Sequence, residues 1–374
     1  MRWVLALLTV WACFCDGAEP VRIAARGQEL TILFGGDIAF GENYVENRKQ
    51  LLRQRGYHDS LERLKPLMER ADFSILNLET PVCRPLPSPL EGKKKPLHWG
   101  HVAQTPATLQ AHGVRLVSLG NNHGFDYGAE GLRETFDALR RHQIDWVGAG
   151  ADREEAARPW VAELNLAGRR QYLAVLGGFE YQTPYRKRYD FYATDGKAGV
   201  ARLELAVMRR QIASLKAVYP DIFVVVFPHW GFDYAWKSLT QSRLGHCLVE
   251  AGADLIIGHG AHRFQEIESY HQSWILYGLG NFVFNTTGRY AETGAPPYSL
   301  VALLTFRKSD TRLKLYPILS DNTRTGYQPR PLEAAEFAEA VRLLGEKNPL
   351  LSFSDGKDDV GRYIEWPLKQ FSSH

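Results

Sequence analysis

Polar side chains of the kinds that bind metal ions follow five short apolar runs of this chain. Each run has the length and character of a buried strand. The runs cover residues 30–34, 73–76, 116–119, 223–227 and 254–257. The residues after them that could do chemistry are Asp37, Glu79, Asn122, His123, His229, His259 and His262. Because the carboxyl ends of parallel strands meet at one edge of a sheet, we expect a shared site at such an edge.

The residue types in this set indicate metal-dependent chemistry. Two carboxylates, an amide oxygen and several imidazoles suit one or two borderline divalent ions, such as manganese, zinc or ferrous iron. Such ions acidify water and polarise a phosphoryl or acyl oxygen. Each residue also has an ordinary structural interpretation: Asp37 could cap a helix, Asn122 could belong to a turn, and His229 could be a hydrogen-bonded core histidine. Their joint occurrence after five strands favours a single site.

Regular patterns between these runs predict the elements that carry them. Apolar residues at helical spacing predict helices over residues 128–142, 200–218 and 239–250, and two more within 46–71. Residues 265–319 contain short strand patterns separated by turns, which is typical of antiparallel pairing. Residues 81–96 hold five prolines and three lysines. We expect this segment to be an exposed loop that overlies the site.

Length and charge limit the classes of function. The 374 residues, 45% of them hydrophobic, are enough for one large α/β domain with insertions or for two ordinary domains. A net charge of +3, without a long basic block, argues against a nucleic-acid partner. The short basic runs at 93–95 and 186–188 would still attract an anionic substrate.

The first residues have the pattern of an export signal. One arginine precedes an apolar run of about 13 residues, shorter than the roughly 20 that span a bilayer. We predict a cleaved signal peptide over residues 1–18 and a periplasmic or cell-surface protein. Lipid attachment at Cys13 is disfavoured because Trp11 is bulky, and a native cytosolic amino terminus is the other alternative. Cys83 and Cys247 would remain, and we expect two unpaired thiols.

Seven motifs in order resemble the CapA family of poly-γ-glutamate capsule synthesis proteins, also called PgsA. Its domain is similar to calcineurin-like metallophosphoesterases. The resemblance covers about residues 30–285. The motifs are Gly36-Asp37, Asn77-Leu78-Glu79, Asn121-Asn122-His123 with Asp126 and Gly128, His229-Trp230-Gly231, Gly252-Ala253-Asp254 leading to Gly258 and His262, Gln265 with Glu268, and the run from Tyr277 to Phe284.

The resemblance implies an α/β fold, a four-layer α/β/β/α sandwich of metallophosphoesterase type. The CapA-like domain would cover residues 27–323, followed by a C-terminal extension over 324–374. A dinuclear metal centre would lie at the strand ends. By that likeness Asp37 and His262 hold the first metal, Glu79 bridges, Asn122 and His229 hold the second metal, His123 is the acid or the phosphate-orienting imidazole, and Asn281 binds substrate.

Two positions depart from the family patterns. Metallophosphoesterases usually carry a histidine two residues after the first aspartate, where this chain has Ala39. The common CapA pattern places a histidine two residues before the final one, where this chain has Gly260, and His259 lies one residue earlier. A shift by one residue turns a strand side chain to the opposite face, although a loop can compensate. A mononuclear site and a weak second metal therefore both stay open.

The leading functional hypothesis is an exported metal-dependent hydrolase, phosphoesterase-like or amide-cleaving, that acts in synthesis or handling of an anionic extracellular polymer such as poly-γ-glutamate. Its partners would be that polymer or a phosphoester substrate, together with capsule-synthesis membrane proteins. One alternative is a non-catalytic polymer-binding subunit of a capsule assembly machine. Another is a general envelope phosphoesterase.

Overall fold

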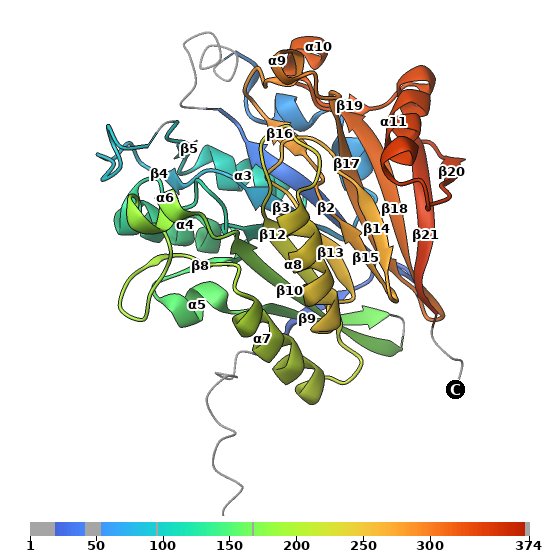
Figure 1. Cartoon of the computed structure of the whole chain (residues 1–374), viewed down its shortest axis with the longest axis horizontal. Helices are drawn as coiled ribbons and strands as arrows, with labels where there is room; N and C mark the ends of the chain where they lie inside the picture. Colours follow the sequence, from blue (N-terminus) through green and yellow to red (C-terminus); the bar gives the residue numbers. More distant parts are fainter. Residues whose placement is uncertain (1–18, 42–53, 95, 167, 371–374) are drawn as a thin grey trace, which may run out of the picture.

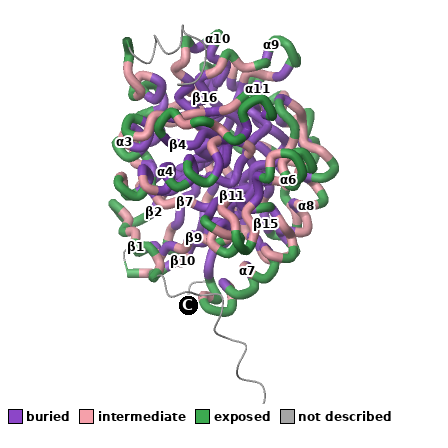
Figure 2. The backbone as a smooth tube through the Cα atoms, turned by 90° about the vertical axis from the view of Figure 1, so that its left-hand side faces the viewer, coloured by how far each residue is buried: buried purple, intermediate pink, exposed green. Residues whose placement is uncertain are grey.

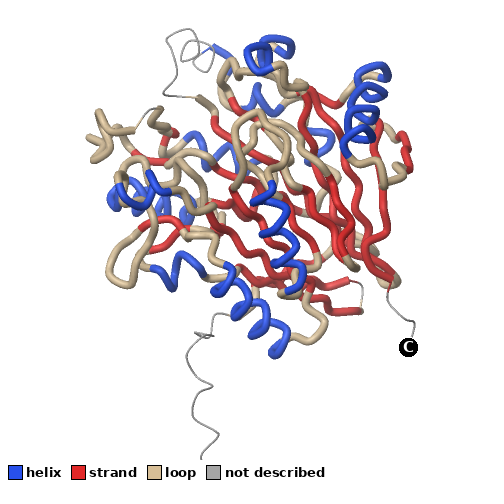
Figure 3. Tube along the Cα trace, viewed as in Figure 1, coloured by secondary structure: helices blue, strands red, loops and turns tan. Residues whose placement is uncertain are grey.

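Two large β-sheets lie face to face at the centre of the protein, and helices cover their outer sides (Figures 1 and 3). The computed structural model of the chain describes residues 19–41, 54–94, 96–166 and 168–370. The predicted signal peptide at 1–18, with Cys13, lies outside these ranges. Among the described helices, none is long and apolar enough to cross a membrane.

The larger sheet has ten strands, and its parallel centre carries the first three of the five apolar runs. Its main path is β20-β21-β18-β17-β2-β3-β6-β7, with β16 beside β2 and β19 beside β18. Strands β16, β2, β3, β6 and β7 run parallel, whereas β17, β18 and β21 continue the sheet in antiparallel fashion. The bounds are β2 (Leu30–Ala39), β3 (Phe73–Leu78), β6 (Val114–Ser118), β7 (Asp145–Val147), β16 (Asn281–Phe284), β17 (Tyr298–Phe306), β18 (Asp310–Leu319), β19 (Arg330–Pro331), β20 (Ser354–Lys357) and β21 (Arg362–Gln370).

The smaller sheet has seven strands and carries the last two apolar runs. Its order is β1-β9-β10-β12-β13-β15-β14, and β10, β12, β13 and β15 are parallel. The bounds are β1 (Val21–Ala24), β9 (Trp160–Leu166), β10 (Arg169–Phe179), β12 (Phe223–His229), β13 (Leu255–Ile257), β14 (Ile267–Tyr270) and β15 (Ser273–Leu276). The antiparallel pairing predicted within 265–319 is confirmed for β14 with β15 and for β17 with β18.

Alternation along the strands divides the core into three layers of side chains. Phe34 of β2 points between the sheets and packs with Phe227 of β12, with ring centroids 5.8 Å apart. Its neighbour Leu33 points outward into a second cluster that includes residues of α3 and α4. Val224 of β12 points to the opposite outer side, into the cluster of α7 and α8. The expected four-layer α/β/β/α sandwich is confirmed, and Figure 2 shows its buried centre within an exposed outer layer.

Several elements differ from the sequence-based expectations. Helix α8 has the predicted bounds, but α7 begins at residue 205 rather than 200, because Gly199–Val200 pair as a short strand with Ala149–Gly150. Of the two helices predicted within 46–71, the first falls largely on residues outside the described ranges, with 54–55 helical, and the second corresponds to the short helices η1 and α2. The remaining bounds are η1 (His58–Leu61), α2 (Lys65–Met68), α3 (Gln104–Ala111), α4 (Gly128–Arg141), α5 (Arg153–Ala157), α6 (Thr183–Lys187), α7 (Leu205–Val218), α8 (Leu239–Glu250), α9 (Tyr290–Thr293), α10 (Asn322–Thr325), α11 (Ala334–Lys347), β4 (Val82–Cys83), β5 (Gly100–His101), β8 (Ala149–Gly150) and β11 (Gly199–Val200).

The expectation of one shared sheet edge is wrong in one respect. The five apolar runs are divided between two sheets, with β2, β3 and β6 in one and β12 and β13 in the other. Their carboxyl ends nevertheless meet, because the two sheets are stacked. Residues beyond 323 contribute β20 and β21 to the larger sheet, and the domain boundaries at 27 and 323 stay predictions. Cys83 and Cys247 are both free thiols, as expected, with Cys83 buried and Cys247 partly buried.

Candidate metal centre

A bulge in β2 places Asp37 at the centre of the site. The register with β3 pairs Gly35 with Leu76 and Asp37 with Asn77, so Gly36 is the extra residue. A bulge of this kind turns the next side chain toward a new direction. A Cβ atom on Gly36 would lie 1.8 Å from the carbonyl oxygen of Gly280, so only glycine fits there. The same carbonyl accepts the backbone N–H of Asp37 at 3.0 Å.

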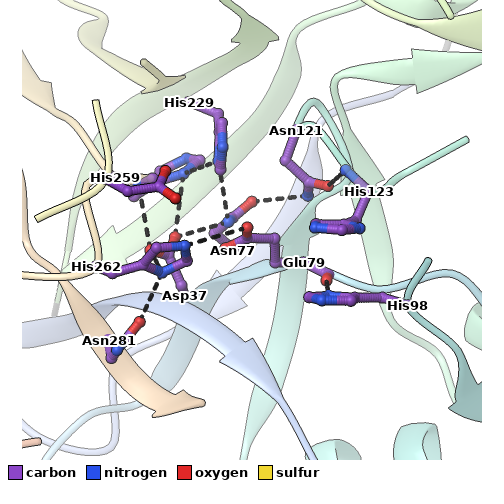
Figure 4. A network of polar contacts seen from close by, with 12 residues as sticks. Asp37, Asn77, Glu79, His98, Asn121, His123, His229, His259, His262 and Asn281 are labelled. Atoms are coloured by element: carbon purple, nitrogen blue, oxygen red, sulfur yellow. Dashed lines mark hydrogen bonds and ion pairs between the residues drawn. The ribbon is translucent and has the colours of Figure 1, made fainter. Parts of the chain in front are cut away.

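Two groups of candidate ligands share Asp37 (Figure 4). Asp37, His229 and His259 form one group, and Asp37, Glu79 and His262 form the other; in each group the ligand atoms lie within 4.8 Å of one another. All five side chains are buried. The family resemblance implies Glu79 as the residue that bridges two metals, whereas in this geometry Asp37 is common to both groups. Carboxylate and imidazole ligands without sulfur suit manganese, zinc or iron.

His259 lies next to His229 and Asp37, one residue before the position where the CapA pattern has a histidine. His259 Nδ1 lies 3.2 Å from Nδ1 of His229 and 3.6 Å from Oδ1 of Asp37. Gly260 has φ +101°, and a Cβ atom there would lie 2.8 Å from the His229 ring. A side chain at 260 would therefore displace His229. The backbone N–H of Gly260 donates instead to Asp37 Oδ2 at 3.2 Å.

His262 is held between carboxylates by a network from β16 and α9. Its Nδ1 lies 2.9 Å from Asn281 Oδ1 and 3.3 Å from Asp37 Oδ2, and its Nε2 lies 3.8 Å from Glu79 Oε1. The Tyr290 hydroxyl accepts from Asn281 Nδ2 and donates to the His262 carbonyl, at 3.1 and 2.8 Å. His262 itself has φ +59°, a conformation that costs a non-glycine residue energy and often marks a functional position.

The electrostatics of the site favour a cation. Burial and the neighbouring Asp37 raise the pKa of Glu79 well above its ordinary value. Although burial lowers it, the Glu79 and Asp37 carboxylates raise the pKa of His262 well above its ordinary value. Two adjacent buried carboxylates thus attract positive charge between them. Within the described ranges, neither Glu79 oxygen accepts a hydrogen bond, and His259 Nε2 also lacks a partner. Buried polar atoms without hydrogen-bond partners are what is expected of residues that bind a metal ion.

Burial also keeps the two strand-end imidazoles neutral. It lowers the pKa of His259 to about 3, and burial together with His259 lowers the pKa of His229 well below its ordinary value. A neutral imidazole is the form that binds a metal.

Asn77 of β3, for which the sequence predicts no role, supports the same residues. Its Nδ2 donates to Asp37 Oδ1 at 2.8 Å and lies 3.4 Å from His229 Nδ1. Asn121 in turn donates to Asn77 Oδ1 at 3.0 Å.

His123 lies beside these groups in a setting made from loops. Its Nδ1 is 2.6 Å from Asp126 Oδ2. Lys94 forms a buried ion pair with Asp126 at 2.7 Å, and the His98 ring is stacked on the His123 ring with centroids 3.4 Å apart. Burial and the Lys94 charge lower the pKa of His123 well below its ordinary value. Asn122 is partly buried, and its Oδ1 has no hydrogen-bond partner among the described residues.

Comparison with known proteins identifies the family. The family model described as "Bacterial capsule synthesis protein PGA_cap" matches residues 31–286, more than half of the chain. The chain belongs to this family. The matched region of this PGA_cap protein contains every predicted site residue from Asp37 to Asn281.

Curated relatives of this PGA_cap protein carry capsule-related names. The capsule biosynthesis protein CapA of Bacillus anthracis is 28% identical over 341 residues, which cover 89% of this chain and 76% of the relative. The PGA biosynthesis protein CapA of Bacillus subtilis (strain 168) is 28% identical over 285 residues, with 76% and 70% covered. Among solved structures, a purple acid phosphatase from yellow lupin (Lupinus luteus) seeds matches at 10% identity, with a TM-score of 0.35. That match covers 83% of this chain but only 55% of the phosphatase.

The sequence of this PGA_cap protein predicts the strand-end residues and, through the motif around His123, Asp126, but it does not predict Lys94 or His98. Asp37, Glu79, His229, His259 and His262 all come together. Lys94 belongs to a short basic run, and nothing in its spacing distinguishes it from Lys93. His98 had no signal at all, because it follows a proline-rich loop without periodicity.

Proposed function

We propose that this protein is an exported metal-dependent hydrolase that acts on an anionic extracellular polymer of the poly-γ-glutamate type. The observation that carries the proposal is the pair of buried ligand groups that share Asp37. Membership of a capsule synthesis family supports the polymer as the substrate class, and the apolar run at 1–18 supports export. A divalent ion held there would polarise an acyl or phosphoryl oxygen and acidify a water molecule.

Residues of this chain would bind the metal ions, transfer a proton and orient the substrate. Asp37, His229 and His259 would hold one ion, and Asp37, Glu79 and His262 a second, with Asn122 Oδ1 as a further available oxygen. His123 would exchange a proton at Nε2, because its Nδ1 faces Asp126. Asn281 would orient substrate from β16, next to His262.

The test compares hydrolysis of poly-γ-glutamate by the manganese-loaded protein and its His123→Ala variant. We expect chain cleavage by the wild type and a loss of roughly 100-fold or more in the variant, the range for a proton-transfer residue. An aryl phosphate assayed in parallel separates polymer cleavage from general phosphoesterase activity. Equal rates for the two proteins, or no cleavage of either substrate, would contradict the proposal.

A second candidate function is a polymer-binding subunit that does not cleave. Ala39 favours it, because metallophosphoesterases usually carry a histidine at this position. Ala39 is buried and pairs with Phe284 of β16, and its methyl group offers no ligand atom. Binding of poly-γ-glutamate by the metal-stripped protein, without cleavage after metal is restored, would support this role instead.

A further inference from the structure

Two neighbouring lysines in the proline-rich loop have opposite environments. Lys93 is exposed, and its ammonium group donates to the nearby Pro89 carbonyl at 3.1 Å. Lys94 is only 4% exposed. Burying an ammonium group is costly unless the charge is paired and its hydrogens are accepted. The loop therefore buries the ammonium group of Lys94 but not that of Lys93.

Lys94 reaches the polar groups next to His123. Its Nζ lies 2.7 Å from Asp126 Oδ1, 3.2 Å from the Pro96 carbonyl oxygen and 3.2 Å from His123 Nδ1. The rings of Tyr185 and Phe191 lie 5.9 Å from it. The polar contacts connect the loop to the segment after β6.

Donor and acceptor rules decide where the His123 proton lies. An ammonium group only donates, and an ionised carboxylate only accepts. His123 Nδ1 is within 2.6 Å of Asp126 Oδ2, so the short contact requires the proton on Nδ1. The Lys94 hydrogens then go to Asp126 Oδ1 and the Pro96 carbonyl. In the neutral ring, Nε2 is left as the acceptor.

His98 fixes the plane of the same ring. Its backbone N–H donates to Asp126 Oδ2 at 2.7 Å, and its Nδ1 lies 3.0 Å from the Glu79 carbonyl oxygen. Its ring is parallel to that of His123, with an interplanar angle of 1°. Figure 4 shows the two rings one above the other, beside Glu79. We call Lys94, His98 and Asp126 the His123 clamp.

We propose that Lys94 is a positioning residue for His123: it holds the Asp126 carboxylate so that His123 keeps its proton on Nδ1 and exchanges protons at Nε2. Only the catalytic consequence rests on the proposed function. The tautomer itself is a property of the folded chain, with or without metal and whatever the substrate.

The experiment is nitrogen-15 NMR of the imidazole side chains in the full chain at about pH 8, where an ordinary histidine is neutral. His123→Gln identifies the His123 signals. We expect a single Nδ1–H tautomer in the wild type and in Lys93→Met, the matched control. In Lys94→Met we expect both tautomers, together with a loss in kcat of about 10- to 100-fold and a small change in KM.

Several results would overturn the inference. An Nε2–H tautomer in the wild type would do so without any variant. So would a Lys94→Met protein with the tautomer and kcat of Lys93→Met. If Lys94→Met does not fold, Lys94→Gln replaces it, because its polar side chain suits the buried position better than methionine; without the ammonium charge beside Asp126, we expect it to fold with mixed tautomers. Unfolding of both variants would assign Lys94 to stability and reject the positioning role. Absence of any hydrolysis in the wild type would reject the proposed function but leave the tautomer result intact.

Discussion

The two sides of the candidate site are built by different means. On the metal side, Asp37, Glu79 and His229 lie at or directly after strands that are buried along their length. On the other side, His123 and its clamp lie in loops, and two clamp members, Lys94 and His98, come from the part of the chain before β6. Strand ends are positioned by the sheets, whereas the loops are positioned by a buried ion pair and a ring stack. The first kind of positioning leaves a pattern in the sequence; of the second kind, the sequence shows His123 and Asp126 but neither Lys94 nor His98.

The largest expected effect separates the two buried carboxylates. Asp37→Asn removes the residue common to both ligand groups, so we expect weak metal binding and a loss of activity above about 100-fold. Asp126→Asn should keep the metal, because Asp126 belongs to neither group, but should lose activity about 10- to 100-fold through a misplaced His123 proton. Competition with a chromogenic chelator and steady-state hydrolysis measure the two effects. Equal metal loss in both variants would contradict the assignment of Asp37 to metal binding and of Asp126 to the positioning of His123.

The next effect concerns stability against acid on the metal side. The pKa of His259 is about 3 in the folded protein, below the value near 6.5 of an unfolded chain. The unfolded state therefore binds a proton that the folded state does not. This histidine's contribution is fully present above pH 6.5 and is lost as pH falls toward 3, at about 1.4 kcal/mol per pH unit.

Urea unfolding of the metal-stripped protein between pH 7.5 and 5 tests this linkage. In His259→Gln, the free energy of unfolding should depend less steeply on pH, by the uptake of up to one proton. The control is His271→Asn, which changes an exposed histidine. An unchanged slope in His259→Gln would show that His259 does not resist protonation in the folded protein.

A smaller effect tests why glycine occupies position 260. Gly260→Ala adds a methyl group 2.8 Å from the His229 ring at φ +101°, so we expect a loss of about 1–3 kcal/mol in stability and weaker metal binding. Gly168→Ala is the matched control, with φ +99° and open space around the added atom. Thermal unfolding compares them. Equal losses would mean that backbone conformation alone, rather than the His229 contact, requires glycine.

The smallest expected effect lies in the support of Asn281. Tyr290→Phe removes a hydroxyl that bonds to Asn281 and to the His262 carbonyl, which should cost about 0.5–1.5 kcal/mol in stability. If Asn281 binds substrate, KM should rise severalfold while kcat changes less. Tyr316→Phe, which removes a hydroxyl bonded to Asp358, serves as the control. A fall in kcat with constant KM would place the effect at His262 instead.

Particular residues show how far the sequence could predict this site. Apolar runs that end on Asp37, Glu79 and His229 predicted both the strands and their shared location. The division of those strands between two sheets depends on long-range pairing, such as β17 with β2, which local periodicity does not encode. The sequence could not explain why glycine replaces the expected histidine at position 260, because the reason is the position of the His229 ring. Lys94 looked like one lysine of three, because burial of a loop residue depends on the partner that receives it.

Metal stoichiometry is the most direct test of the central claim, that Asp37 joins two ligand groups. Elemental analysis after loading with manganese, zinc or iron(II) and gel filtration would be applied to the wild type, Asp37→Asn and His123→Ala. We predict one or two ions per chain in the wild type, the same content in His123→Ala, and almost none in Asp37→Asn. No bound ion in the wild type, or equal content in Asp37→Asn, would contradict the account.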